Sequence, residues 1–380
     1  MKTKICDMLG IDFPLLAFSH CRDVVAAVSR AGGMGVLGAV TLTPEQLEEE
    51  LTWIDAHVDG KPYGIDVIVP NAMEGKGQPM EPDKMIAALP EDHRHFTADL
   101  LKRHDVDPAD LDELRQDYLN FGTNLQEGGA TDLLNVAFSH PIKLIANALG
   151  VPPQGMIDRA KREGVPIAAL VGTKDHALRQ VEAQVDIIIA AGGEAGGHCG
   201  DISTMVLVPE VVQAVEAAGS DIPVLAAGGI VTGRQMAAAM AMGAAGAWTG
   251  SVWLTTSEAE TAPAVKEKML SATSRDTVRS KSRTGKFSRQ LRSVWTDAWE
   301  SGEGPKPLPM PLQSLITEPA LNKINKLADS GHAGAKQLAT YWVGQGVGLM
   351  NQPMAAGQVV QAFKEDFAGA FERLGDLLAD

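Results

Sequence analysis

A repeated alternation of short apolar runs and helical stretches constrains the fold more than any other feature of the chain. In the central part, apolar runs at 165–170, 185–190, 222–230 and 244–251 alternate with helical spacing at 174–184, 209–219 and 233–243. Each run is continuously apolar, which is typical of strands buried on both faces of a parallel sheet. Strand–helix–strand units with short loops predict such a sheet with right-handed crossovers.

The same alternation opens the chain. Strands are predicted at 13–18, 33–40 and 63–70, with helices at 21–32 and 43–58, the second begun by Thr43 as N-cap and Pro44. After an interruption the strands resume with "LLNVAFS" at 133–139. These runs predict an α/β fold of the (β/α)8 type, a TIM barrel.

Two parts of the chain fall outside this alternation. Residues 71–130 are polar and charged, and we interpret them as an inserted helical subdomain or a lid over the barrel mouth. After 258 the sequence is helical and irregular, with a Pro-rich stretch at 302–312 and an amphipathic helix at the end that is expected to pack on the barrel. The predicted division is therefore 1–70 with 131–258 as barrel core, 71–130 as insertion and 259–380 as helical C-terminal part.

The amino-acid composition limits the classes of partner that this chain can bind. A formal net charge of −15 argues against a nucleic-acid partner. We find no signal peptide and no membrane span, and three widely spaced cysteines suit a reducing cytoplasm. The sequence has no CxxC or HExxH pattern, so no metal is expected, and the predicted partner is a small-molecule substrate in a cytoplasmic protein.

Three predicted strand ends are rich in glycine, at 192–200, 228–229 and 249–251. In a (β/α)8 barrel the carboxyl ends of the strands meet at one rim, where ligands bind. Exposed backbone N–H groups at glycine turns and helix N-termini bind anions. Gly228, Gly229, Gly250 and Ser251 are therefore predicted to form a phosphate site.

His198 is the candidate catalytic residue, because it follows its strand directly and lies on the predicted catalytic rim. Cys199 is interpreted as a bystander, since no partner arrangement singles it out as a nucleophile. Glu194 is expected to fix the glycine-rich turn by accepting backbone N–H bonds. His20 and Arg22 lie at the end of the first predicted strand. Two roles stay open for them: His20 contacts a cofactor ring, or both residues only cap the next helix and carry surface charge. The remaining candidates, His93, His95 and His104, are interpreted as solvated residues of the insertion.

The segments "AAGGEAGGHCG" (190–200), "VLAAGGIVTGRQMAAAMAMGAAGAWTGSVWLTTSEAE" (224–260) and "RAGGMGVLG" (30–38) carry a resemblance. They resemble the nitronate monooxygenases, FMN-dependent TIM barrels that include FMN-type enoyl-acyl-carrier reductases and NADH:quinone reductases. The resemblance implies FMN as cofactor and His198 as the active-site histidine. It implies a cofactor site that comprises Ala17, Phe18, Ser19, Asp66, Ala191, Gly196, Gly197, Gly228, Gly229, Trp248, Thr249, Gly250 and Ser251.

The chain departs from the family pattern in three places. Asp66 stands where the family usually has Asn near the flavin, Ala191 stands where Gln is common, and Ala17–Phe18–Ser19 replaces Ala-Pro-Met. An ionised Asp66 near the flavin pyrimidine would oppose the charge of reduced FMN and lower its potential.

The sequence is compatible with three functions. The first is oxidation of a nitronate-like carbanion by FMN with O2 as co-substrate, with His198 as base where the substrate is a neutral nitroalkane. The second is an NAD(P)H-dependent FMN reductase of an enoyl or acyl thioester, or of a quinone. The third, of another class, is a non-catalytic barrel that binds a phosphorylated ligand.

Overall fold

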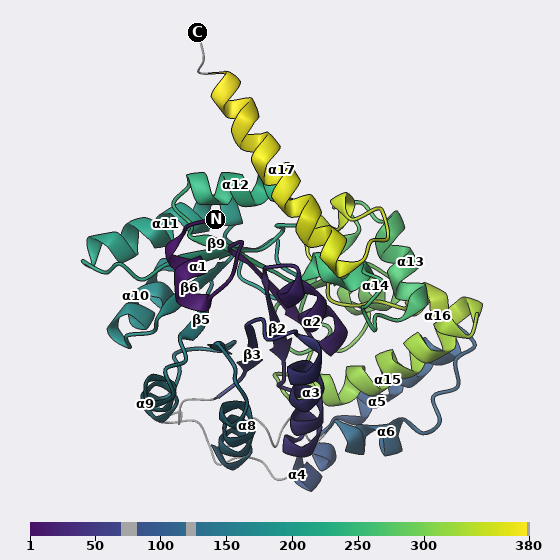
Figure 1. Ribbon diagram of the computed structural model, residues 1–380. Coiled ribbons are helices and arrows are strands. Elements are labelled where there is room, and N and C mark those ends of the chain that lie inside the picture. The colour runs from purple at the N-terminus through teal and green to yellow at the C-terminus, as the bar shows by residue number, and fades with distance from the viewer. Residues whose placement is uncertain (70–81, 119–126, 378–380) are drawn as a thin grey trace.

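The computed structural model describes residues 1–69, 82–118 and 127–377. Within these ranges, eight parallel strands close into a barrel in the order β1-β2-β3-β4-β5-β6-β8-β9, with helices around it (Figure 1). Pairing of β9 with β1 closes the barrel and places Trp248 opposite Leu16. The predicted TIM barrel is therefore confirmed. Its strands are β1 (Leu15–Ser19), β2 (Met34–Gly38), β3 (Tyr63–Val67), β4 (Leu144–Asn147), β5 (Ile167–Val171), β6 (Ile187–Ala191), β8 (Val224–Ala227) and β9 (Gly246–Thr249).

The barrel interior is a packed core. Leu16, Met34, Leu144 and Leu225 point into it, and they form one cluster with buried residues of helix α1 such as Ile5. These residues come from the first halves of their strands, so α1 closes the amino-terminal end and leaves the carboxyl-terminal rim for the site. The helices of this part are α1 (Lys4–Leu9), α2 (Arg22–Arg30), α3 (Pro44–His57), α8 (Glu127–Ser139), α9 (Gln154–Glu163), α10 (Lys174–Glu182), α11 (Thr204–Ala217) and α12 (Gly233–Ala241).

Local sequence signals explain where several of these helices begin. The predicted N-cap Thr43 accepts a hydrogen bond from the N–H of Gln46, and the Gln46 side chain accepts from the N–H of Thr43, which completes a capping box. Thr232 and Gln235 form the same box at the start of α12. Both boxes satisfy backbone donors that a helix N-terminus leaves unpaired.

One predicted element is wrong, and another begins at the wrong residue. Residues 133–139 are the end of helix α8, and the fourth strand is Leu144–Asn147, whose four residues are too few to show a period. The helix expected at 209–219 begins earlier, at Thr204, so Pro209 lies inside it. Pro209 is tolerated there because the carbonyl that loses its partner is that of Met205, in the exposed first turn.

The described part of the insertion packs with the C-terminal part in a second hydrophobic core. Helices α4 (Pro82–Ala87), α5 (Glu91–Lys102) and α6 (Leu111–Asp117) contact α15 (Leu312–Asp329), beside which Figure 1 shows α5 and α6. Leu100 and Leu101 are buried in one cluster with Trp295, Ile316 and Leu321. The division of the chain that the sequence predicts stays a prediction, but its second and third parts share this core. The other elements here are η1 (Ser251–Thr255), α13 (Pro263–Ser271), α14 (Val294–Glu300), α16 (Ala333–Leu338) and η2 (Gln345–Leu349).

A small antiparallel sheet joins the C-terminal part to the barrel rim. Strands β10 (Thr277–Ser280) and β11 (Ser288–Leu291) form a hairpin, and β11 pairs with β7 (Gly197–His198). Because its strands are polar and charged, the sequence showed only a helical and irregular region here. The sheet brings residues about ninety positions apart in the sequence to the His198 loop.

The last helix, α17 (Ala356–Asp376), packs its first half on α12 and α2. Val360 and Phe363 are buried there, whereas the second half extends away from the molecule (Figure 1). None of the described helices is long and apolar enough to span a membrane.

Candidate active site

The residues predicted to bind a cofactor lie at the carboxyl-terminal rim of the barrel. Ala17, Phe18 and Ser19 end β1, Asp66 lies near the end of β3, and Ala191 ends β6. The glycine pairs follow β6 and β8, and the last segment ends β9 and begins η1: Gly196, Gly197, Gly228, Gly229, Trp248, Thr249, Gly250 and Ser251. The structure therefore brings all of them to one rim.

The glycines of this rim do two different things. Gly228 and Gly229 have φ of +106° and +70°, and a Cβ at Gly228 would lie 2.7 Å from Thr204 Oγ1. These positions require glycine because the backbone is left-handed and closely packed. At Gly250 the nearest atom to an added Cβ, Phe18 Cδ1, is 3.9 Å away, so the backbone here is open.

Glu194 fixes the glycine-rich loop, as the sequence predicted. Its Oε2 accepts hydrogen bonds from the backbone N–H of Thr204 at 2.8 Å and from the Thr204 hydroxyl at 2.9 Å. Thr204 is the first residue of α11, so the carboxylate satisfies a donor at a helix N-terminus. The loop after β6 is thereby joined to the helix that follows it.

A segment that the sequence analysis did not assign also reaches this rim. Gly344 N donates to Ser251 Oγ at 2.8 Å, and Gln345 N donates to the carbonyl oxygen of Glu194 at 2.9 Å. A Cβ at Gly344 would lie 2.5 Å from that same carbonyl oxygen, so the two backbones touch. The glycine run "VGQGVG" at 343–348 was the signal in the sequence.

His198 is held by the hairpin. It lies opposite Ser288 in the β7–β11 ladder, and its Nε2 is 2.7 Å from Thr284 Oγ1. The side chain reaches solvent although most of its surroundings are protein. This burial first, and then the charges of Lys286 and Arg283, lower the pKa of His198 to about 4. The imidazole is therefore neutral at pH 7.

Two arginines support this arrangement, and sequence reasoning missed both. Arg289 donates to the carbonyl oxygen of Gly193 from Nε at 3.0 Å and from Nη2 at 2.8 Å, which ties the hairpin to the glycine loop. Arg283 is buried and forms a two-pronged ion pair with Glu318, with distances of 2.7 and 2.9 Å. Its guanidinium carbon lies 3.8 Å from the centre of the Trp342 ring.

Asp66 and His20 line the other side of the rim. Asp66 is only 4% exposed, and burial raises the pKa of its carboxyl group well above the usual range. Among the residues that the structure describes, no side chain or backbone group hydrogen-bonds to this carboxyl group. Burial therefore disfavours the ionised form of Asp66, which is the form expected to lower the reduction potential of the flavin. The ring of His20 contacts Gly38 O at 2.9 Å through Nδ1, and burial lowers its pKa.

The histidines of the insertion have different environments. His93 is buried, with Nε2 2.9 Å from Lys306 O, so its interpretation as a solvated residue is wrong. It packs in the second core near Trp299, and a local sequence pattern does not show that contact. His104 is half-buried against its own helix and contacts Leu100 O at 3.0 Å, whereas His95 is exposed beside Glu91.

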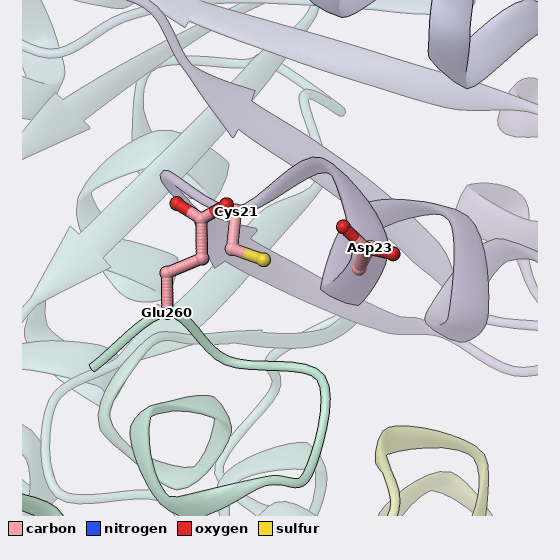
Figure 2. A group of neighbouring side chains, drawn as sticks. All are labelled: Cys21, Asp23 and Glu260. Carbon is pink, nitrogen blue, oxygen red and sulfur yellow. The ribbon is translucent and has the colours of Figure 1, made fainter. Parts of the chain in front are cut away.

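One group of side chains of the metal-ligand type occurs among the described residues. Cys21 and Asp23, at the start of α2, and Glu260, from the loop after η1, place ligand atoms within 4.8 Å of one another (Figure 2). The Cys21 thiol donates to Glu258 O at 3.1 Å, and burial raises its pKa. A neutral thiol already engaged in a hydrogen bond is a poor metal ligand.

Comparison with known proteins identifies the family. The family model described as nitronate monooxygenase matches residues 3–366. The Mycobacterium tuberculosis protein Rv1533, provisionally named a monooxygenase, is 52% identical over 380 residues, which are 100% of both chains. A Staphylococcus saprophyticus protein, provisionally named a nitronate monooxygenase, is 28% identical and covers 95% of this chain and 96% of its own length.

A solved structure agrees with the family that these sequence matches indicate. Nitroalkane oxidase from Streptomyces ansochromogenes superimposes with a TM-score of 0.77 at 25% identity, covering 97% of this chain and 99% of that one. This chain belongs to the nitronate monooxygenase family and is an FMN-dependent oxidoreductase of that family.

Proposed function

We propose that this protein oxidises a nitronate-like carbanion, using FMN bound at the barrel rim and O2 as electron acceptor. The observation that carries the proposal is the position of His198, which lies at the rim in the β7–β11 ladder, with its Nε2 2.7 Å from Thr284 Oγ1. The loop between β10 and β11 also carries the exposed Lys286, whose positive charge disfavours an imidazolium at His198 and favours an anionic substrate. A pKa of about 4 also makes His198 a weak base, so the substrate enters already ionised, as a nitronate rather than as a neutral nitroalkane.

The rim residues fit FMN. The open backbone at Gly250 and the left-handed turn at Gly228 and Gly229 suit a phosphate group. Ser251 Oγ already accepts from Gly344 N, which leaves the hydroxyl proton to donate to a phosphate oxygen. Phe18, which is half-buried at the end of β1, stacks on the buried Trp248 with ring centres 6.3 Å apart, so an aromatic ring lies at the rim where a planar ring is proposed to bind.

The protein contributes orientation and charge, while bound FMN would supply the redox chemistry between the carbanion and O2. Thr284 Oγ1 lies 2.7 Å from His198 Nε2 and 3.4 Å from both the N and the O of Lys286. We assign the hydroxyl proton to the shorter contact, so that Thr284 donates to His198 Nε2. His198 Nδ1 then carries the ring proton and donates it in a hydrogen bond to the nitronate oxygen. Lys286 balances the charge of the anion.

The test is an anaerobic mixing experiment that follows the flavin absorbance. We expect a small nitronate to bleach the flavin rapidly, and its neutral nitroalkane to do so much more slowly. His198→Ala removes one hydrogen bond to an anion and is expected to lower kcat/KM for the nitronate about 10- to 100-fold. His95→Ala, which removes an exposed histidine, is the control. Equal rates with both substrates, or an unchanged His198→Ala enzyme, would refute the proposal.

A second candidate is an NAD(P)H-dependent FMN reductase of an enoyl or acyl thioester or of a quinone. The basic hairpin β10–β11 beside the rim favours it, because NAD(P)H and coenzyme A thioesters are both anionic. Rapid bleaching by NAD(P)H, without bleaching by nitronate, would select this function.

A further inference from the structure

Asp66 is a buried carboxyl group that points into the mouth of the barrel. In the eight barrel strands, all of which lie within the described ranges, no other residue has a carboxyl side chain. Ile65 and Val67, on either side of it, belong to the core between the strands and the helices. Because side chains alternate along a strand, Asp66 points the opposite way, into the barrel. Its neighbour in the β3–β4 pair, Ala146, lies in the interior cluster.

Two aromatic rings lie beside this carboxyl group. Asp66 stands opposite Gly38 in the β2–β3 pair. A Cβ at Gly38 would lie 2.8 Å from Phe18 Cζ and 2.7 Å from His20 Nδ1, so both rings cover this glycine. The missing side chain at Gly38 therefore leaves room for the rings next to Asp66, at the part of the rim where a planar ring is proposed to bind.

The surroundings of Asp66 supply nothing that would stabilise a carboxylate. The residue is only 4% exposed, and burial is the cause of the raised pKa of its carboxyl group. Neither a cation nor a hydrogen-bond donor contacts the group in the ranges that the structure describes. Burial also lowers the pKa of the neighbouring His20, which disfavours a cation there. A protonated carboxyl group has one O–H donor, and a buried donor without an acceptor is costly.

A flavin ring at this rim would supply the acceptor. The oxygens and ring nitrogens of its pyrimidine half accept hydrogen bonds, and the reduced ring carries a negative charge. A second negative charge beside it, in a site closed to water, is strongly disfavoured. A carboxylic acid that stays neutral instead donates a hydrogen bond to the charge that develops.

We propose that Asp66 keeps its proton in the FMN-bound enzyme and donates a hydrogen bond to the flavin ring, which stabilises the reduced form. The inference rests on the proposed FMN site, because it assigns a role to this chain's own residue there. It also reverses the effect expected of an ionised Asp66. A neutral donor raises the reduction potential of the flavin, whereas a carboxylate would lower it.

The test is the reduction potential of the bound FMN, measured by equilibration with a reference dye and without substrate. Asp66→Leu removes the donor. We expect it to lower the potential by at least about 30 mV, which is a tenfold loss of preference for the reduced flavin. Asp66→Asn keeps a neutral donor and is expected to stay close to the wild type. The control is Asp132→Asn, at an exposed position on α8, which is expected to leave the potential unchanged.

The direction of the change decides between the alternatives. A higher potential in both Asp66 variants would show that the carboxyl group is ionised beside the flavin. An unchanged potential in Asp66→Leu would show that Asp66 makes no hydrogen bond to the ring. Either result would overturn the proposal.

A second measurement does not depend on the folding of Asp66→Leu. Infrared difference spectra between oxidised and reduced enzyme detect the C=O stretch of a protonated carboxyl group whose hydrogen bond changes. We expect this band in the wild type and in Asp132→Asn, and its loss in Asp66→Asn. A wild type without the band, or a band that persists in Asp66→Asn, would overturn the proposal.

The proposed reaction and this inference fail separately. The flavin spectrum, recorded first, shows whether FMN is bound, and a protein without FMN would refute both. A protein that holds FMN but does not oxidise nitronates would refute only the proposed reaction, because the potential and the infrared band are measured without a nitronate.

Discussion

At the scale of single residues, desolvation shifts the pKa of two groups at the rim. It lowers the pKa of His198 to about 4 and raises the pKa of Asp66 well above its usual range, because a desolvated site disfavours the charged form of either group. The positive charges near His198 are those of Lys286, which is exposed, and of Arg283, which is paired with Glu318. An anion at the rim is therefore expected to meet the charge of Lys286 beside the His198 ring.

The raised pKa of Asp66 predicts a pH-dependent stability of the apoprotein. Above the ordinary Asp pKa of about 3.9, the unfolded chain has lost a proton that folded Asp66 still holds, so stability falls as pH rises. The free energy of unfolding falls by up to about 1.4 kcal/mol for each pH unit over which only the folded state holds the proton. Asp66→Asn removes this dependence. We therefore expect it to gain stability over the wild type as pH rises from 4, and to show no such advantage below pH 4.

Urea unfolding of both FMN-free proteins between pH 3.5 and 8 measures this difference. Asp132→Asn, at an exposed position on α8, is the matched control and is expected to follow the wild type at every pH. A constant difference between Asp66→Asn and the wild type would show that Asp66 is ionised in the folded protein.

At the scale of elements, local signals predicted most of the barrel. The strands predicted at 185–190 and 244–251 are found at 187–191 and 246–249, and the predicted N-cap Thr43 begins its helix, because each of these features depends on a few neighbouring residues. The hairpin that holds His198 was missed because its strands are polar and pair across the sequence, as in Ser288 with His198. Site glycines follow strand ends and were found, whereas Thr284, Arg283 and Arg289 reach the rim only through tertiary structure.

The hairpin depends on the buried ion pair between Arg283 and Glu318, whose side chains are 4% and 16% exposed. Glu318→Gln leaves the Arg283 charge buried without its partner and is expected to cost about 3–5 kcal/mol of unfolding free energy. Asp297→Asn breaks the Arg292–Asp297 pair, which is 59% and 50% exposed, and is expected to cost less than about 1 kcal/mol. Urea unfolding at pH 7 compares the two variants with the wild type. Similar losses of unfolding free energy in both variants would contradict a central role for Arg283.

At the scale of the whole molecule, two cores meet at the rim. The barrel core supplies the glycine turns, and the second core supports the hairpin that covers them. The chain returns from the second core to the barrel through η2 and α17. There α12 and α17 pack so closely that a Cβ at Gly233 would lie 2.0 Å from Phe363 O. The C-terminal helix therefore stabilises the barrel near the place where β9 closes it.

Substitutions of two phenylalanines of α17 test whether this helix stabilises the barrel. Phe363 is 1% exposed in the barrel core, and Phe371, two turns later on the same helix, is 72% exposed. Phe363→Ala leaves a cavity between α17 and the barrel and is expected to cost about 3–5 kcal/mol of unfolding free energy. Phe371→Ala is expected to change it by less than about 0.5 kcal/mol. Urea unfolding with FMN-free protein measures both. A large loss from Phe371→Ala would mean that the projecting half of α17 is covered in solution, and a small loss from Phe363→Ala would mean that α17 does not stabilise the barrel.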